Sequence, residues 1–114
     1  MNKIVISGLE VHAVIGVYAH EQLITQTLFI DLSFSVDVAR AALNDVLSDT
    51  HDYAKICEAV SSFVQQTPCR LLETLAHRLA DYLTRQFQLS ALELSITKRP
   101  MDMPGVAVAV KVCV

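Results

Sequence analysis

Hydrophobic residues occupy every even position from Leu28 to Val38 in this chain, and all but one of the odd positions between them are polar. A hydrophobic period of two is the signature of a long β-strand with one buried face. Such a face needs a covering layer, so the segment requires a sheet that packs against other apolar elements.

A second segment of the same kind, Lys3 to Val14, precedes this one, although Gly8 interrupts its pattern and predicts a β-bulge. The two segments are expected to pair as an antiparallel hairpin. Their connection runs from Ile15 to Thr25 and mixes aromatic, imidazole and carboxylate groups, which a simple turn does not need.

The middle of the chain changes to helical spacing. One apolar stripe runs from Ile56 to Val64 and another from Leu72 to Leu83, with Thr67-Pro68 breaking the chain between them. The last third returns to a period of two, first at Leu92, Leu94 and Ile96, and then at alternate valines from Val106 to Val114. The order ββααββ predicts an α+β fold, in which two helices cover one face of a four-stranded antiparallel sheet.

Composition limits the class of protein. A chain of 114 residues that is 53% hydrophobic suits one compact domain spanning residues 1–114, and no repeat or linker suggests a second. No apolar run is long enough to cross a bilayer and no secretory segment is evident, so a cytoplasmic protein is expected. The net charge of −3, without a basic cluster, argues against a nucleic-acid or anionic membrane partner. A small molecule or a second copy of the chain is the expected partner.

Cysteine and histidine spacing gives no reason to expect a disulfide framework or a metal site. The three cysteines form no CxxC pair, and the four histidines show no HxH or HExxH spacing. The last strand, in contrast, carries a single charge at Lys111 and is a long candidate edge strand. Because unpaired strand edges pair readily with other chains, we expect the protein to form oligomers.

Lys98 stands where a strand pattern breaks, directly before Arg99-Pro100. A lysine at such a place could act as a base, form a Schiff base or bind an anion, or it could be a solvated lysine that flanks a strand. The residues alone do not decide between these roles.

Four segments of the chain, in this order and spacing, resemble those of the dihydroneopterin aldolase family. They are Ile15 to Gln22, Asp49 to Tyr53, Leu71 to Ala76 and Ile96 to Pro100. The resemblance implies a tunnelling fold (T-fold) that assembles into an oligomeric barrel, as a homotetramer or a homo-octamer with sites at the subunit interfaces. It also implies retro-aldol cleavage of 7,8-dihydroneopterin in folate biosynthesis, with 2′-epimerisation as a side activity. The related triphosphate epimerase and a non-catalytic pterin-binding ring protein are the alternatives.

The same resemblance assigns roles to individual residues. Glu73, in a segment with Leu72, is expected to hold the 2-amino group and a ring N–H of the pterin, since a carboxylate offers two acceptors to two parallel donors. Lys98 is expected to take part in acid-base catalysis, with a pKa lowered by desolvation or by a nearby cation such as Arg99. No metal, cofactor or Schiff base is implied. Outside the family, Glu73 would simply favour the first turn of a helix.

Three further expectations concern the remaining segments. Tyr53 is expected to reach in from a neighbouring subunit for proton transfer, or alternatively to cover the apolar face of a helix. Glu21 is expected to approach the side-chain hydroxyls of the substrate, or to be an exposed loop carboxylate. His51 and Asp52 are expected to contact the pterin ring through their main chain, although the imidazole could equally be a surface group.

Overall fold

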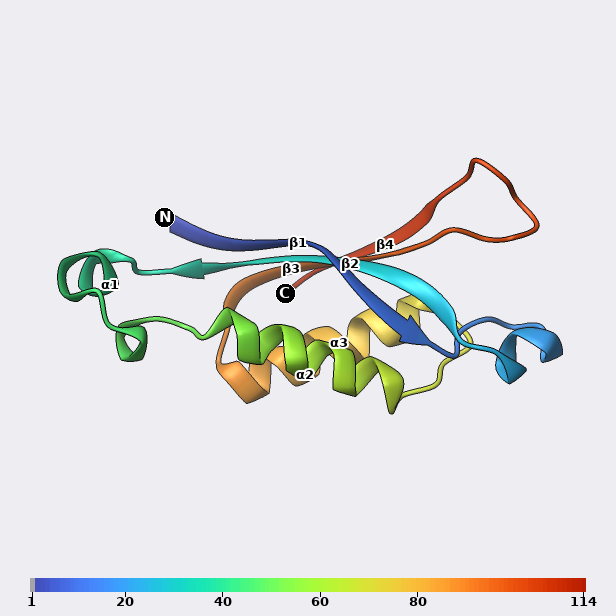
Figure 1. The fold of residues 1–114 in the computed structure, drawn as a ribbon, viewed down its shortest axis with the longest axis horizontal. Helices are drawn as coiled ribbons and strands as arrows, with labels where there is room; N and C mark the ends of the chain where they lie inside the picture. Colours follow the sequence, from blue (N-terminus) through green and yellow to red (C-terminus); the bar gives the residue numbers. More distant parts are fainter. Residues whose placement is uncertain (1) are drawn as a thin grey trace.

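The computed structural model describes residues 2–114 and contains one four-stranded antiparallel sheet in the order β1-β2-β3-β4 (Figure 1). Its strands are β1 (Asn2–Ala13), β2 (Gln26–Val36), β3 (Ser90–Lys98) and β4 (Val108–Cys113). Two long helices, α2 (Tyr53–Gln65) and α3 (Leu72–Phe87), lie side by side on one face of this sheet. The predicted order and the one-sided cover of the sheet are therefore confirmed.

Three short helical segments were not predicted. The 3-10 helix η1 (Ala19–Leu23) lies in the connection after β1, and α1 (Ala39–Asn44) and η2 (Leu47–Asp49) follow β2. The strand that begins near Leu28 ends at Val36 and not at Val38, because the Asp37 carboxylate accepts a hydrogen bond from the Ala39 amide at 3.0 Å and turns the chain into α1. A six-residue helix is too short to show a recognisable apolar stripe.

The β-bulge expected at Gly8 is present. Pairing between β1 and β2 shifts register between Ile6 and Leu9, and Gly8 has a φ of 70°, which favours glycine. Its amide donates a hydrogen bond to the Asp31 carboxylate at 2.7 Å, so the amide that the bulge frees from the ladder still has an acceptor.

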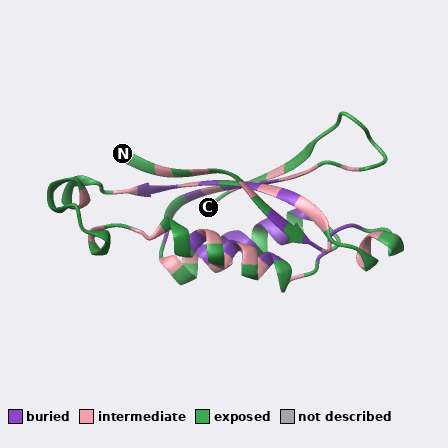
Figure 2. Ribbon diagram, viewed as in Figure 1, coloured by how far each residue is buried: buried purple, intermediate pink, exposed green. Residues whose placement is uncertain are grey.

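The core lies between the sheet and the two helices, where buried residues from both layers face each other (Figure 2). The even-numbered residues from Leu28 to Phe34 are at most 2% exposed. Facing them are the predicted stripes of the helices, except that Phe63 is only partly buried and stacks on Tyr82. On the edge strand β4 the pattern fails in part, because Val108 is 42% exposed. Buried apolar area is thus concentrated at the centre of the sheet.

The two helices run in opposite directions, and this gives the sheet two distinct ends. Asp52 caps the start of α2 by accepting hydrogen bonds from the amides of Ala54 and Lys55. The chain then crosses the sheet and returns through Cys69, whose backbone pairs with that of Ile15 just beyond β1. Consequently α3 begins at the end of the sheet where β1 and β3 finish, whereas α2 begins at the opposite end.

No helix within residues 2–114 is both long enough and apolar enough to span a membrane.

We predict that Leu79→Ala lowers the free energy of unfolding by about 2–5 kcal/mol, because Leu79 is fully buried in α3 and its truncation leaves a cavity in the core. Leu43→Ala is the matched control, since Leu43 is 83% exposed on α1, and it should change the stability by less than about 0.5 kcal/mol. Urea denaturation of both variants at one protein concentration measures the difference. Equal losses would contradict the assignment of the core.

Candidate active site

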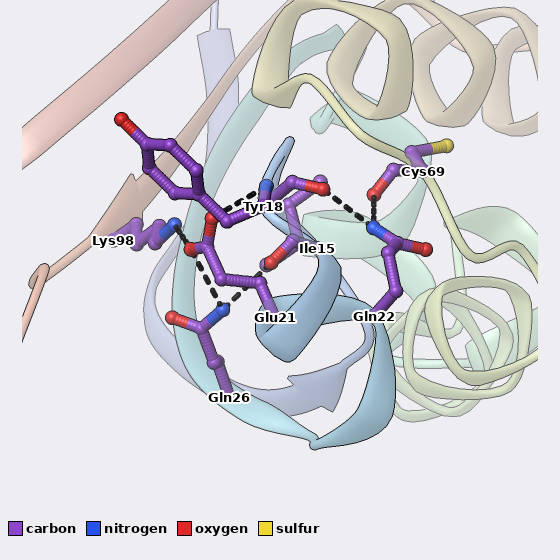
Figure 3. A network of polar contacts seen from close by, with 8 residues as sticks. Ile15, Tyr18, Glu21, Gln22, Gln26, Cys69 and Lys98 are labelled. Atoms are coloured by element: carbon purple, nitrogen blue, oxygen red, sulfur yellow. Dashed lines mark hydrogen bonds and ion pairs between the residues drawn. The ribbon is translucent and has the colours of Figure 1, made fainter.

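Four segments of the chain meet at the end of the sheet where α3 begins (Figure 3). They are the connection from Ile15 through η1, the first residue of β2 at Gln26, the turn at Cys69 and the last residue of β3 at Lys98. Side-chain hydrogen bonds join all four, and we refer to this arrangement as the four-segment junction. It contains two of the predicted catalytic residues.

Glu21 and Lys98 form an ion pair at the centre of the junction. The distance from Lys98 Nζ to Glu21 Oε2 is 2.7 Å, and the two side chains are only 15% and 13% exposed. Glu21 also accepts hydrogen bonds from the Tyr18 amide and from the Gln26 side chain. Hydrogen bonding by Lys98 is the main reason that the pKa of Glu21 is lowered below its usual value, and partial burial opposes this shift. Glu21 is therefore an ionised carboxylate at neutral pH and not an exposed loop residue.

Arg99 was one of the cations that could lie beside the Lys98 amine, but its side chain points to a different group. The Arg99 guanidinium lies over the Phe29 ring, 5.6 Å from its centre, so the charged group beside Lys98 is the anion Glu21. This pair joins residues 77 positions apart in the sequence, and no local pattern could have revealed it.

Gly16 makes room for the Glu21 carboxylate. A Cβ atom on Gly16 would overlap the carboxyl group of Glu21, and the φ of 135° at Gly16 is a conformation that side chains rarely adopt. Gly16 is also buried, and its amide donates a hydrogen bond to the Cys69 carbonyl at 3.3 Å. The backbone conformation thus favours glycine at position 16, and an added Cβ would force the Glu21 carboxylate to move.

The junction also contains two glutamines that the sequence analysis did not predict as site residues. Gln26 donates hydrogen bonds to the Ile15 carbonyl at 2.6 Å and to Glu21 at 3.4 Å. Gln22 donates to the carbonyls of Gly16 and Cys69. Both side chains belong to half-buried residues within or beside the connection that already looked too polar for a turn, which is the only sequence signal that could have suggested them.

The substrate-binding residues predicted on α3 lie at the same end of the molecule. Leu72 is 8% exposed and belongs to the core, and Glu73 is exposed in the first turn of α3. The turn before them is held to the junction by hydrogen bonds between Cys69 and the backbone of Val14 and Gly16. The structure therefore brings the segment carrying Glu73 to the Glu21–Lys98 pair.

The remaining predicted residues lie elsewhere. The His51 ring meets the Phe34 ring edge-on at 5.3 Å, the Asp52 carboxylate caps α2, and Tyr53 is 63% exposed at the start of that helix. Lys98 pairs with Leu28 in the sheet, and Phe34 lies six residues further along β2, which corresponds to about 20 Å. The predicted site is thus divided between two ends of one chain. The alternative that Tyr53 covers the apolar face of α2 does not fit its exposure.

Within residues 2–114, no group of three or more His, Cys, Asp or Glu side chains is arranged to hold a metal ion.

Comparison with known proteins identifies the family. Residues 4–114 match the sequence model of dihydroneopterin aldolase. Dihydroneopterin aldolase of Haemophilus influenzae is 36% identical to this chain over 98 residues, which cover 86% of this chain and 83% of the relative. Among solved structures, E. coli dihydroneopterin aldolase in complex with neopterin is 31% identical, with a TM-score of 0.92 over 98% of this chain and 97% of its own. A Burkholderia dihydroneopterin aldolase bound to guanine is 25% identical, with a TM-score of 0.78 over 98% and 88%.

The sheet with its one-sided helical layer, together with these likenesses, defines a protein of the tunnelling fold. The chain belongs to the dihydroneopterin aldolase family, whose members are carbon–carbon lyases.

We predict that Glu21→Gln destabilises the protein at neutral pH and that the difference from the wild type disappears in acid. The pKa of Glu21 is lower in the folded chain, so its contribution is complete above the ordinary glutamate pKa of about 4.3 and is lost as the pH falls through the lowered value. Urea denaturation between about pH 7 and pH 3 measures the effect. Glu58→Gln, on the exposed surface of α2, is the control. A difference that persists undiminished in acid would contradict the ion-pair interpretation.

We also predict that Gly16→Ala lowers kcat/KM by about 10²-fold, because the added Cβ displaces the Glu21 carboxylate from Lys98. Gly105→Ala is a matched control: Gly105 also has a positive φ, of 82°, but no atom lies within 4 Å of the added Cβ. Both variants therefore carry backbone strain, and only the first disturbs the site. Steady-state kinetics compares them, and equal losses would show that strain alone is responsible.

Proposed function

We propose that this chain cleaves 7,8-dihydroneopterin into 6-hydroxymethyl-7,8-dihydropterin and glycolaldehyde by a retro-aldol reaction, as a step of folate biosynthesis, without a metal ion or cofactor. The observation that supports this most directly is the half-buried Glu21–Lys98 pair, with the segment carrying Glu73 hydrogen-bonded beside it. Relatives that cover nearly the whole chain are named dihydroneopterin aldolase, and one of them is solved in complex with neopterin.

The reaction needs a proton acceptor, an electron sink and a proton donor. A side-chain hydroxyl of the substrate loses its proton, and the carbon–carbon bond breaks to give the carbonyl of glycolaldehyde. The electrons of that bond enter the ring imine, which must be protonated to accept them. A proton then adds to the carbon attached to the ring and completes the hydroxymethyl group. The dihydropterin itself is the electron sink, so no lysine imine or metal ion is required.

The residues of the four-segment junction suit the side-chain part of this chemistry. Glu21 is an ionised acceptor for a substrate hydroxyl, and the Lys98 ammonium donates to the same carboxylate. Because an ammonium cannot accept a proton, we assign proton transfer at the hydroxyl to Lys98 after it has released one proton to water, with Glu21 orienting the hydroxyl. Because the pair is largely shielded from solvent, a substrate that enters between the two groups exchanges one strong polar contact for another.

Glu73 and Leu72 are proposed to bind the pterin ring. The exposed carboxylate of Glu73 is free to accept two parallel N–H groups from the 2-amino edge of the ring, and Leu72 anchors that turn of α3 in the core. The ring would then lie across the start of α3, and the trihydroxypropyl group would extend toward Lys98.

Tyr53, His51 and Asp52 are proposed to act in the site of a neighbouring copy of the chain. They lie about 20 Å along β2 from the junction, so one chain cannot bring both groups to one substrate. The edge strands β1 and β4 leave backbone groups for pairing with other chains, which supports a homotetramer or homo-octamer. A pocket of about 340 Å³ beside His51, lined by Asp37 and Thr50 among others, offers a surface that a second copy could cover.

We predict that two inactive variants restore activity when their subunits are mixed. Lys98→Ala removes the group at the junction, and Tyr53→Ala removes the phenol at the other end. If each site combines both ends from different copies, random reassembly yields intact sites in about a quarter of cases. The measurement is turnover after joint unfolding and refolding of the two variants, with Lys98→Ala mixed with Glu21→Ala as the control. No gain over the separate variants would contradict a site shared between subunits.

The function itself is tested by incubating the chelator-treated protein with 7,8-dihydroneopterin and with its triphosphate. We expect glycolaldehyde and 6-hydroxymethyl-7,8-dihydropterin from the unphosphorylated substrate, with some 2′-epimer as a side product, because the cleaved intermediate can recombine. Borohydride should trap no adduct on Lys98. Epimer formation from the triphosphate alone would assign the related epimerase instead, and turnover of neither would leave a pterin-binding ring protein.

A further inference from the structure

Gln22 is a half-buried side chain that joins two distant parts of the backbone. Its Nε2 donates one hydrogen bond to the Gly16 carbonyl at 2.5 Å and another to the Cys69 carbonyl at 3.3 Å (Figure 3). Both N–H groups of one amide are therefore used, and the second contact spans 47 residues of sequence. Gln22 lies directly after Glu21 within η1.

The contacts of Gln22 lie between the two groups proposed to bind the substrate, the Glu21–Lys98 pair and the turn that carries Glu73. On one side, Gly16 packs against the Glu21 carboxylate, which is paired with Lys98. On the other side, Cys69 belongs to the turn that leads into Leu72 and Glu73 at the start of α3. Among residues 2–114, one short parallel bridge, between Ile15 and Cys69, connects the same two segments through the backbone. The Gln22 amide is thus a second connection between the carboxylate that faces the substrate side chain and the helix that holds the ring.

We propose that Gln22 is a positioning residue that sets the distance between the Glu21–Lys98 pair and the pterin-binding turn of α3. This inference rests on the proposed function of Glu21, Lys98 and Glu73. Gln22 does not touch the substrate, and it acts by holding the Gly16 and Cys69 carbonyls in one fixed arrangement.

A positioning role has a consequence that a merely structural role lacks. A pterin without the trihydroxypropyl group needs only Glu73, and Glu73 moves together with the first turn of α3. A complete substrate must reach Glu73 and Lys98 at once, so a small change in the spacing of the two segments misaligns the reacting hydroxyl. Loss of Gln22 should therefore lower turnover and leave binding of the pterin ring nearly intact.

The experiment compares Gln22→Met and Gln22→Glu with the wild type. Methionine keeps the length and volume of the side chain without its N–H donors, and glutamate keeps the shape but places a carboxylate against two carbonyls. Two quantities are measured: kcat with 7,8-dihydroneopterin, and the dissociation constant of 6-hydroxymethyl-7,8-dihydropterin, which lacks the trihydroxypropyl group. Gln65→Met, at the exposed end of α2, is the control for the substitution. Glu73→Gln serves as the reference for weakened ring binding.

We expect both Gln22 variants to lose about 10- to 100-fold in kcat, while the dissociation constant of the ring ligand changes by less than about threefold. Because Gln22→Met retains the packing volume, it keeps the test valid even if Gln22→Glu fails to fold. A lower melting temperature with wild-type kcat would show a purely structural role and overturn the proposal. Ring affinity falling in parallel with kcat, as in Glu73→Gln, would overturn it too. Ring binding without any turnover by the wild type would refute the proposed reaction, and the positioning role with it.

Discussion

The sheet has one apolar face, and two antiparallel helices cover it. This constraint decides where almost every functional residue lies. The even-numbered residues of β2 from Leu28 to Phe34 are buried in one core with residues of α2 and α3, and burial on this scale dominates the stability of a chain of this size. Since the helices run in opposite directions, their first turns lie at opposite ends of the sheet, as Figure 1 shows. Glu73 and Tyr53 each stand in such a first turn, and so they are far apart within one chain.

The ion pair at the four-segment junction illustrates what such a scaffold can support. Removing two charges from water is costly, and a shielded pair is stable only when further hydrogen bonds satisfy its remaining polar atoms. Here the Tyr18 amide and the Gln26 side chain supply those contacts to Glu21, and Gly16 leaves the space that the carboxylate fills. Lys98 stands at the last residue of β3, and the ladder with β2 determines where its backbone lies. Rigid strands and a specific loop together make the pair.

The division of the candidate site between two ends of the chain is the basis for the proposal that the protein functions as an assembly. The sheet leaves β1 and β4 as edges, and β4 exposes Val108 although its valines follow the alternation of a buried strand. Apolar residues on an unpaired edge favour association with a further strand. The same association could bring Tyr53 of one copy to the junction of the next, so that stability and completeness of the site would depend on one interface.

Much of the fold could be predicted from the sequence, because hydrophobic period depends on local geometry. The alternation from Leu28 to Phe34 and the stripe from Leu72 to Leu83 report directly which face of a strand or helix is buried. Gly8 marked its bulge for a similar reason, since few other residues adopt its conformation. The helix α1 was missed because six residues are too few to show a period.

The candidate site, like the fold, could be predicted from the sequence only in part. By itself, the sequence determined the order of the elements and, through resemblance to a family, predicted roles for Glu21, Tyr53, Glu73 and Lys98. Only the tertiary structure decided that Lys98 is paired with Glu21, that the Arg99 guanidinium lies over Phe29, and that Gln22 joins Gly16 to Cys69. These contacts span between 6 and 77 residues and depend on strand register, on helix direction and on the path of one loop. Local sequence patterns do not encode these contacts, because the contacts form only when the whole chain has packed.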